Sequence, residues 1–139
     1  SVLPSDTVLI VTADHGQVHV GERTIIPPRE IVDLVDHQSG EGRFRWLHAK
    51  RGRAAALVDA CSMYTDVAWV ATADQIIDEK WFGPRMSDEV KRRLGDVALV
   101  AHQPVSFEEP LDSGAFPLVC RHGSLTADEM LVPLLAKRA

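Results

Sequence analysis

The sequence lacks the features of several protein classes. It has no apolar stretch long enough to cross a bilayer, and a polar start followed by a short apolar run does not form a signal peptide. Its only cysteines are Cys61 and Cys120. Two thiols can pair, but in a chain of ordinary composition they indicate free or buried cysteines of a reducing compartment. We therefore expect a cytoplasmic location.

Phosphate-binding glycine motifs and a basic surface are also missing. No glycine-rich segment has Walker or Rossmann spacing. The net charge is −5 and the pI is about 5.6, which argues against nucleic acid or an anionic membrane as the main partner. Two short basic runs, 50–53 and 91–93, are typical of solvated faces. We expect no nucleic-acid partner and no membrane partner.

The chain does have the composition and length of one globular domain, residues 1–139. It is 45% hydrophobic and 25% charged. Short apolar runs predict strands at Thr7–Ala13, Phe44–Ala49, Val67–Thr72, Val97–His102, Leu118–Cys120 and Met130–Leu135. The first and third runs are apolar almost throughout, which predicts strands covered on both faces.

Helical patterns alternate with these runs. They are predicted at Arg53–Tyr64, Ala73–Trp81 and Ser87–Leu94, the last with Ser87 as its N-cap. Alternating strands and helices favour an α/β fold, with a mostly parallel sheet and flanking helices.

The first candidate site is the motif Asp14-His15-Gly16, directly after the first predicted strand. Ligands of open α/β sheets bind beyond the carboxyl ends of strands. A carboxylate and an imidazole are good zinc ligands, and Gly16 allows a tight turn. By spacing alone, an Asp-His pair in a turn, with Asp14 accepting backbone hydrogen bonds, is the more common structure.

The second candidate is His122, in the segment Arg121–Thr126 after another apolar run. Thr126 and Glu129 have capping-box spacing, which predicts a helical turn there. A lone histidine is more often a surface or hydrogen-bonded residue than a ligand. Of the other histidines, His48 and His102 are expected in the core, and His19 lies near the first motif.

Together, the two motifs resemble the alkaline phosphatase superfamily, and most closely its nucleotide pyrophosphatase/phosphodiesterase branch. VLIVTADHGQV is similar to a segment that supplies metal ligands there, and LVCRHGSLTADEMLVPLLA is similar to the closing histidine segment. The middle of the chain is also similar to actinobacterial proteins of this type through SGEGRFRWLHA, DVAWVAT, WFGP and LGDVALVA. The resemblance spans nearly the whole chain.

The resemblance implies an alkaline-phosphatase-like fold and two divalent metal ions, usually zinc. Asp14 and His15 match the pair that binds the metal beside the nucleophile, and His122 matches a ligand of the other metal. Such enzymes hydrolyse phosphate esters or nucleotides through a covalent Thr or Ser phospho-intermediate. No residue here matches that nucleophile, which lies in the N-terminal part of such enzymes.

We therefore interpret the chain as the C-terminal part of a larger hydrolase, catalytically inactive alone and partnered by the N-terminal part of its parent. Exposed apolar surface and self-association of the isolated piece are expected consequences. One alternative is a non-catalytic α/β binding or assembly module. Another is an unrelated α/β domain with two chance motifs, which predicts that Asp14, His15 and His122 lie far apart.

Overall fold

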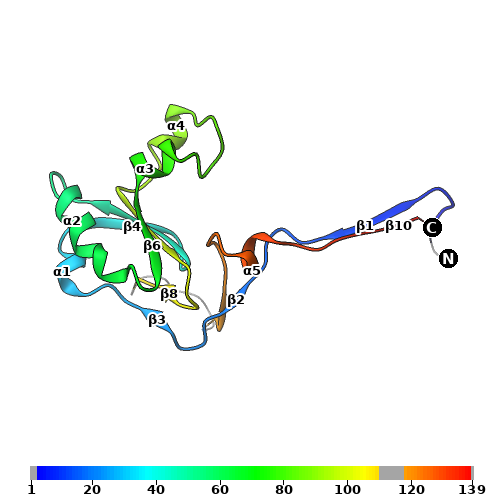
Figure 1. Cartoon of the computed structure of the whole chain (residues 1–139), viewed down its shortest axis with the longest axis horizontal. Helices are drawn as coiled ribbons and strands as arrows, with labels where there is room; N and C mark the ends of the chain where they lie inside the picture. The colour runs from blue at the N-terminus through cyan, green and yellow to red at the C-terminus, as the bar shows by residue number, and fades with distance from the viewer. Residues whose placement is uncertain (1–2, 110–117, 139) are drawn as a thin grey trace.

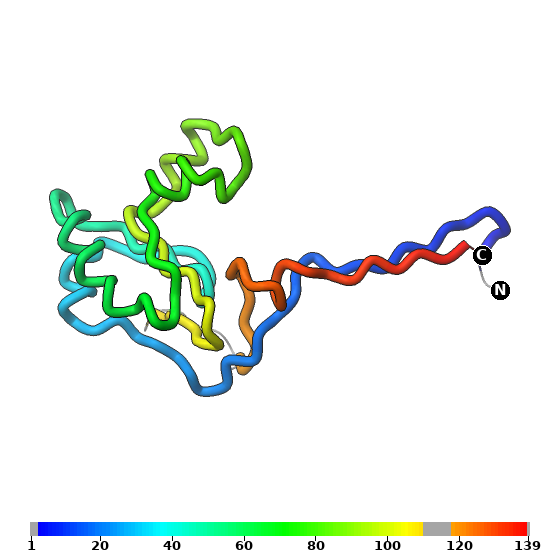
Figure 2. The backbone as a smooth tube through the Cα atoms, viewed as in Figure 1, coloured from blue at the N-terminus to red at the C-terminus, as the bar shows by residue number. Residues whose placement is uncertain are grey.

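The computed structural model describes residues 3–109 and 118–138 and has two parts, a rounded body and a long arm (Figure 1). The body is built around a four-stranded sheet within residues 24–107. The arm is a ribbon of two strands that extends away from the body (Figure 2). Within the described residues, no helix has both the length and the apolar character needed to cross a membrane.

The strands of the body's sheet are all antiparallel to their neighbours. In spatial order they are β4 (Val35–Glu41), β5 (Phe44–Ala49), β7 (Val97–Ala101) and β6 (Ala68–Thr72). The chain turns from β4 into β5 at Gly42 and Arg43. So short a connection can only join antiparallel strands.

The expectation of a mostly parallel sheet is therefore wrong. β5 and β6 are joined through helix α2 (Ala54–Cys61), which is the connection typical of a parallel pair. Both strands run antiparallel to β7, which lies between them, so they point the same way without sharing hydrogen bonds. The alternation of strands and helices predicted the β5–α2–β6 connection. It did not predict that β7, which comes later in the chain, lies between β5 and β6.

Helices cover both faces of the sheet, and β7 is buried from both sides. Its residues Val97, Leu99 and Ala101 face one core, whereas Ala98 and Val100 face the other. This alternation is the period of two that a strand imposes on its side chains. The helices are α1 (Arg29–Val32), α2 and η1 (Ser62–Tyr64) on the first face, α3 (Ala73–Asp78) on the second, and α4 (Asp88–Lys91).

Several local predictions are confirmed in the body. Strand β5 has the predicted bounds, and the predicted helix Arg53–Tyr64 is present as α2 followed by η1. The Ser87 hydroxyl accepts the Val90 N–H at 3.3 Å, as an N-cap does. Both cysteines are free, and burial raises the pKa of Cys61 to about 12.

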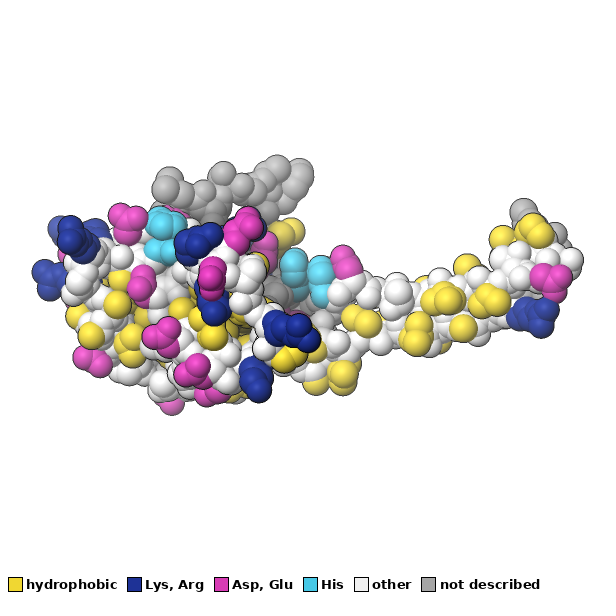
Figure 3. All heavy atoms as spheres, turned by 90° about the horizontal axis from the view of Figure 1, so that it is seen from above, with side chains coloured by type: hydrophobic (Ala, Val, Ile, Leu, Met, Phe, Trp, Pro, Cys, Tyr) yellow, Lys and Arg dark blue, Asp and Glu magenta, His cyan; other side chains and the backbone are white. Residues whose placement is uncertain are grey.

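The arm pairs β1 (Val8–Thr12) with β10 (Leu134–Arg138) in antiparallel register. All residues of both strands are exposed, and hydrophobic side chains line the arm (Figure 3). The predicted strand at Thr7–Ala13 is therefore present, but its predicted burial is wrong. The predicted strand Met130–Leu135 is shifted, because Met130 ends helix α5 (Ala127–Met130) and β10 begins at Leu134.

Two short ladders connect the ends of the chain to the body. Strand β2 (Val18–His19) pairs antiparallel with β9 (Cys120–Arg121), and β3 (Thr24–Ile25) pairs parallel with β8 (Ser106–Phe107). The β2–β9 ladder places the segment that follows the arm's first strand beside the segment that precedes its second (Figure 2). The same region carries both sequence motifs.

The central position of β7 predicts a large stability cost for truncating Leu99. Its side chain is 0% exposed, so Leu99→Ala leaves a cavity and is expected to lower the free energy of unfolding by about 3 kcal/mol. Leu131→Ala is the matched control, because Leu131 is 76% exposed and its truncation is expected to cost less than about 0.5 kcal/mol. Urea unfolding measures both, and equal losses would contradict the assignment of the core.

The β4–β5 hairpin holds a pair of histidines. The rings of His37 and His48 stack with centroids 3.9 Å apart, and His48 Nε2 lies 2.9 Å from the Ser39 hydroxyl. Burial lowers the pKa of His48, and the neighbouring His37 lowers it further. The folded protein therefore favours neutral His48.

This pKa shift predicts a loss of stability at mildly acidic pH. Below about pH 6.5, unfolded chains bind a proton at His48 that the folded chain resists, so the free energy of unfolding falls as pH is lowered through that value. Urea midpoints at pH 7.5 and 5.0 should differ less in His48→Gln than in the unaltered chain. His19→Gln, at an exposed histidine, is the control. An unchanged pH dependence in His48→Gln would refute this prediction.

Candidate active site

Two pairs of antiparallel strands bring the sequence motifs together. The segment 13–17 lies between β1 and β2, and the segment 122–133 lies between β9 and β10. Because β1 pairs with β10 and β2 pairs with β9, these segments must lie opposite each other at the base of the arm. Histidine side chains gather at this junction (Figure 3).

The first motif forms a tight loop directly after β1. The Asp14 carboxylate accepts the His15 N–H at 3.1 Å, which is the turn interaction expected of such a pair. His15 Nδ1 lies 2.9 Å from the Gly16 carbonyl oxygen. Since a carbonyl only accepts, Nδ1 carries the proton, and the neutral ring presents its lone pair at Nε2.

Gly16 is needed because the loop packs against the backbone of α5. Its N–H donates to the Glu129 carbonyl at 2.8 Å. A Cβ at this position would lie 1.9 Å from the carbonyl oxygen of Asp128, which no side chain can tolerate.

The second motif forms the loop between β9 and α5. Gly123 has φ +110°, a conformation that favours glycine, so the chain can turn immediately after His122. Ser124 is buried, and its hydroxyl donates to the Ala101 carbonyl at the end of β7. The loop that carries His122 is thereby fixed to the central strand of the body.

His15 and His122 meet between these loops. Their rings stack with centroids 3.8 Å apart and planes 15° from parallel. Asp14 Oδ2 lies 3.7 Å from His15 Nε2, and the Asp14 side chain is 88% exposed. The arrangement has one carboxylate and two imidazoles at one solvent-facing place, contrary to what two unrelated chance motifs predict.

The remaining histidines lie elsewhere in the body or on its edge. His19 lies in β2 and is exposed, whereas His48 and His102 are half-buried rather than in the core. His102 Nε2 lies 3.2 Å from the Thr65 carbonyl oxygen.

The donor types fit a zinc ion, but their number is small. His15 has the arrangement of many ligand histidines, with one ring nitrogen bonded to a carbonyl and the other facing a carboxylate. Zinc sites usually need three or four protein ligands. Among residues 3–109 and 118–138, no group of three or more His, Cys, Asp or Glu side chains has a geometry that holds a metal.

A buried ion pair supports the second loop. Arg43 and Glu129 are both almost fully buried, and the Arg43 Nε and Nη2 atoms each donate to the Glu129 carboxylate at 2.8 Å. Thr126 and Glu129 have the spacing of a capping box, which predicts a helical turn. The helical turn is present, but Thr126 makes no side-chain cap, and its hydroxyl donates to the Glu129 carboxylate instead.

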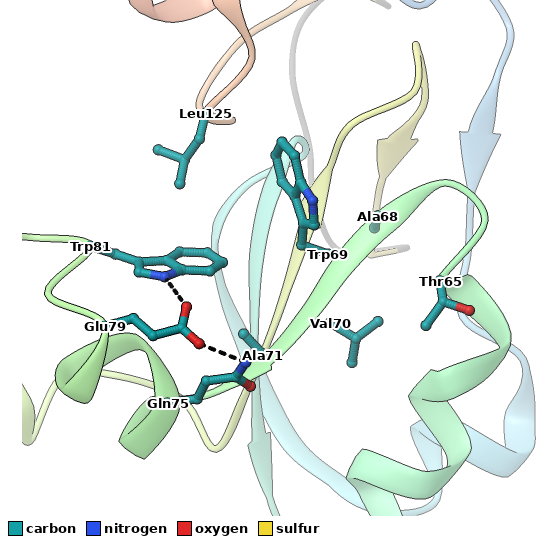
Figure 4. Close-up of a pocket in the computed structure, with 9 residues that line it drawn as sticks. All are labelled: Thr65, Ala68, Trp69, Val70, Ala71, Gln75, Glu79, Trp81 and Leu125. Carbon is teal, nitrogen blue, oxygen red and sulfur yellow. Dashed lines mark hydrogen bonds between the residues drawn. The ribbon is translucent and has the colours of Figure 1, made fainter.

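A pocket of about 540 Å³ lies against strand β6 and reaches the second loop at Leu125 (Figure 4). Trp69 and Trp81 supply two of its walls. The carboxylate of Glu79 accepts the Trp81 indole N–H at 2.7 Å and the Gln75 amide at 3.0 Å. These two hydrogen bonds lower the pKa of Glu79, and the bond from Trp81 has the larger effect. The pocket thus combines aromatic walls with an ionised acid.

No protein-family model and no curated protein sequence matches the chain. Solved structures do match. Murine ectonucleotide pyrophosphatase/phosphodiesterase 5 aligns with a TM-score of 0.65 and 21% identity, over 95% of this chain and 34% of that one. The human protein of the same name aligns with a TM-score of 0.66 and 19% identity, over the same shares of the two chains.

Phosphonoacetate hydrolase from Sinorhizobium meliloti, in complex with phosphonoformate, aligns with a TM-score of 0.63 and 18% identity, over 94% of this chain and 36% of that one. The chain thus spans about a third of the length of the structures it matches. At this level of identity the similarity establishes the fold. The chain therefore shares its fold with the matched third of these structures of ectonucleotide pyrophosphatase/phosphodiesterase 5 and phosphonoacetate hydrolase.

Proposed function

We propose that this chain is the C-terminal, ligand-bearing part of a two-metal hydrolase of phosphate esters, a phosphodiesterase, nucleotide pyrophosphatase or phosphatase. The observation that carries the proposal is the stacking of His15 on His122, 3.8 Å apart, beside Asp14. These residues come from opposite ends of the chain and are the ones that the motifs single out. The fold around them is one in which hydrolases are found.

Under this proposal, Asp14 and His15 hold one metal ion and His122 holds the other. The Gly16 carbonyl keeps His15 in the tautomer whose Nε2 is free to bind, and the exposed carboxylate of Asp14 supplies negative charge beside it. Zinc suits these donors. When bound, the two ions neutralise phosphoryl charge and make a hydroxyl nucleophilic. The remaining ligands and the Thr or Ser nucleophile belong to the N-terminal part of the parent chain.

The substrate is a phosphate ester or nucleotide whose organic group needs a surface of its own. The pocket of Trp69 and Trp81 supports this part of the proposal, because Leu125 lines it and lies in the same loop as His122. Aromatic walls suit a planar or apolar substituent. An inactive variant of the murine structural neighbour has been solved in complex with AMP.

The arm supports the proposal that the parent's N-terminal part packs on this chain. Val8, Ile10, Leu134 and Leu135 are all more than half exposed, and a two-stranded ribbon is marginally stable alone in water. A further strand beside β1 or β10 would cover these side chains. In isolation, the same surface favours self-association.

A non-catalytic binding or assembly module is the second candidate. The small number of potential ligands supports it, since within the described residues no cluster of three or more is able to hold a metal. Metal-dependent turnover separates the two candidates.

Hydrolysis of bis-p-nitrophenyl phosphate by the full-length gene product, with and without zinc, tests the function. Zinc-dependent turnover is expected, and His15→Ala and His122→Ala are each expected to lower it by about 100-fold or more, because each removes a direct ligand. His37→Ala is the control, since it removes a stacked histidine of the β4–β5 hairpin instead. No turnover with any divalent metal would favour the module, and equal losses in all three variants would exclude the assigned site.

A further inference from the structure

Glu129 bonds to both candidate loops, through its side chain to one and through its backbone to the other. Its helix α5 begins directly after the loop that carries His122 and lies against the loop that carries His15. Its side chain is 1% exposed although it bears a charge. A buried carboxylate is retained only where strong hydrogen bonds replace the water it has lost.

The carboxylate of Glu129 fixes the second loop. Oε1 accepts the Ser124 N–H at 2.9 Å, and Oε2 accepts the Thr126 hydroxyl. Arg43 approaches both oxygens from the body in a bidentate ion pair. Burial acts to raise the pKa of Glu129, but the bonds from Arg43, Thr126 and Ser124 outweigh it and lower the pKa, so the group remains charged.

The backbone of the same residue fixes the first loop. The Glu129 carbonyl accepts the Gly16 N–H at 2.8 Å, and the close approach of the Asp128 carbonyl explains why a glycine stands there. Gly16 in turn bonds to His15 through its own carbonyl. Glu129 is therefore two short hydrogen-bonded steps from His15, and its side chain holds the backbone two residues beyond His122.

We propose that Glu129, paired with Arg43, is a positioning residue. It fixes the position of the loop that carries His15 relative to the loop that carries His122, and so determines the contact between the two rings. That the two loops carry metal ligands rests on the proposed function, whereas the contacts of Glu129 with them do not. Glu129 does not touch substrate or metal. It acts through the two loops, and the arm extends from the same junction.

The test uses NMR of the 139-residue chain without metal, and compares Glu129→Gln with the unaltered chain. The nuclear Overhauser contact between the His15 and His122 rings is expected to disappear. The contact between the Phe44 and Trp46 rings, which lie 5.4 Å apart in the body, is expected to remain. Asp128→Asn, at the exposed neighbour on the same helix, is the matched control and should keep both contacts.

Glu129→Gln leaves Arg43 buried without a counter-charge and is therefore at risk of unfolding. The double variant Arg43→Met, Glu129→Leu removes both charges with similar volume and should keep the Phe44–Trp46 contact while losing the histidine contact. Gly16→Ala tests the hydrogen bond from the Gly16 N–H to the Glu129 carbonyl, and it should also lose the histidine contact. Retention of that contact in folded Glu129→Gln or in the double variant would overturn the proposal. Loss of the Phe44–Trp46 contact in both would do so too, because Glu129 would then determine the body.

The zinc affinity of the full-length gene product, measured by competition with a chelator, gives a second readout. Because the two loops are no longer held in their relative position, Glu129→Gln is expected to bind zinc about 10-fold or more weakly. The zinc affinity of Asp128→Asn is expected to stay unchanged. Failure of the unaltered full-length product to bind zinc would count against the proposed function, whereas the ring contact in the 139-residue chain would still decide the role of Glu129. Unchanged zinc affinity in folded Glu129→Gln would overturn that role.

Discussion

The ion pair between Arg43 and Glu129 is the constraint on which the junction of body and arm depends. Both side chains are withdrawn from water, and the cost of doing so is offset only if every charged atom finds a partner. Arg43 lies in the turn between β4 and β5, and beyond Glu129 it donates to the carbonyls of Ala101, Gln103 and Val105. One guanidinium thereby orders the β4–β5 turn, the segment after β7 and helix α5 together.

This arrangement explains how a helix of only four residues holds a fixed position. An isolated turn of helix is unstable in water. Here Glu129 receives bonds from Arg43, Ser124 and Thr126, so the surrounding structure supplies the stability that the helix lacks. The β2–β9 ladder adds a second restraint on the same loops. The loops are therefore held from the body as well as by the pairing of β1 with β10 in the arm.

The sequence predicted local structure well and spatial arrangement less well. Strand β5 follows from a short apolar run and helix α2 from the helical spacing of its apolar residues, because both patterns are local in the sequence. Asp14, His15 and His122 were found through motif resemblance, since spacing alone favoured an ordinary turn. Arg43 had no local signal: its partner Glu129 is distant in sequence, and only the fold brings a buried cation and a buried anion together. The capping-box spacing correctly predicted the helical turn at Ala127–Met130, but it gave no sign that Glu129 is buried against Arg43.

The exposed arm and the small number of metal donors have a common explanation under the proposed function. Strand β1 leads directly into Asp14, so any strand that pairs in parallel beside β1 ends at the same edge as Asp14 and His15. Side chains beyond the carboxyl ends of parallel strands meet at one place. A neighbouring strand from the parent chain would therefore cover Val8 and Ile10 and, in the same step, deliver ligands to the incomplete site. Apolar burial on the arm and assembly of the metal centre would then be one event, which makes metal affinity dependent on docking of the parent's N-terminal part.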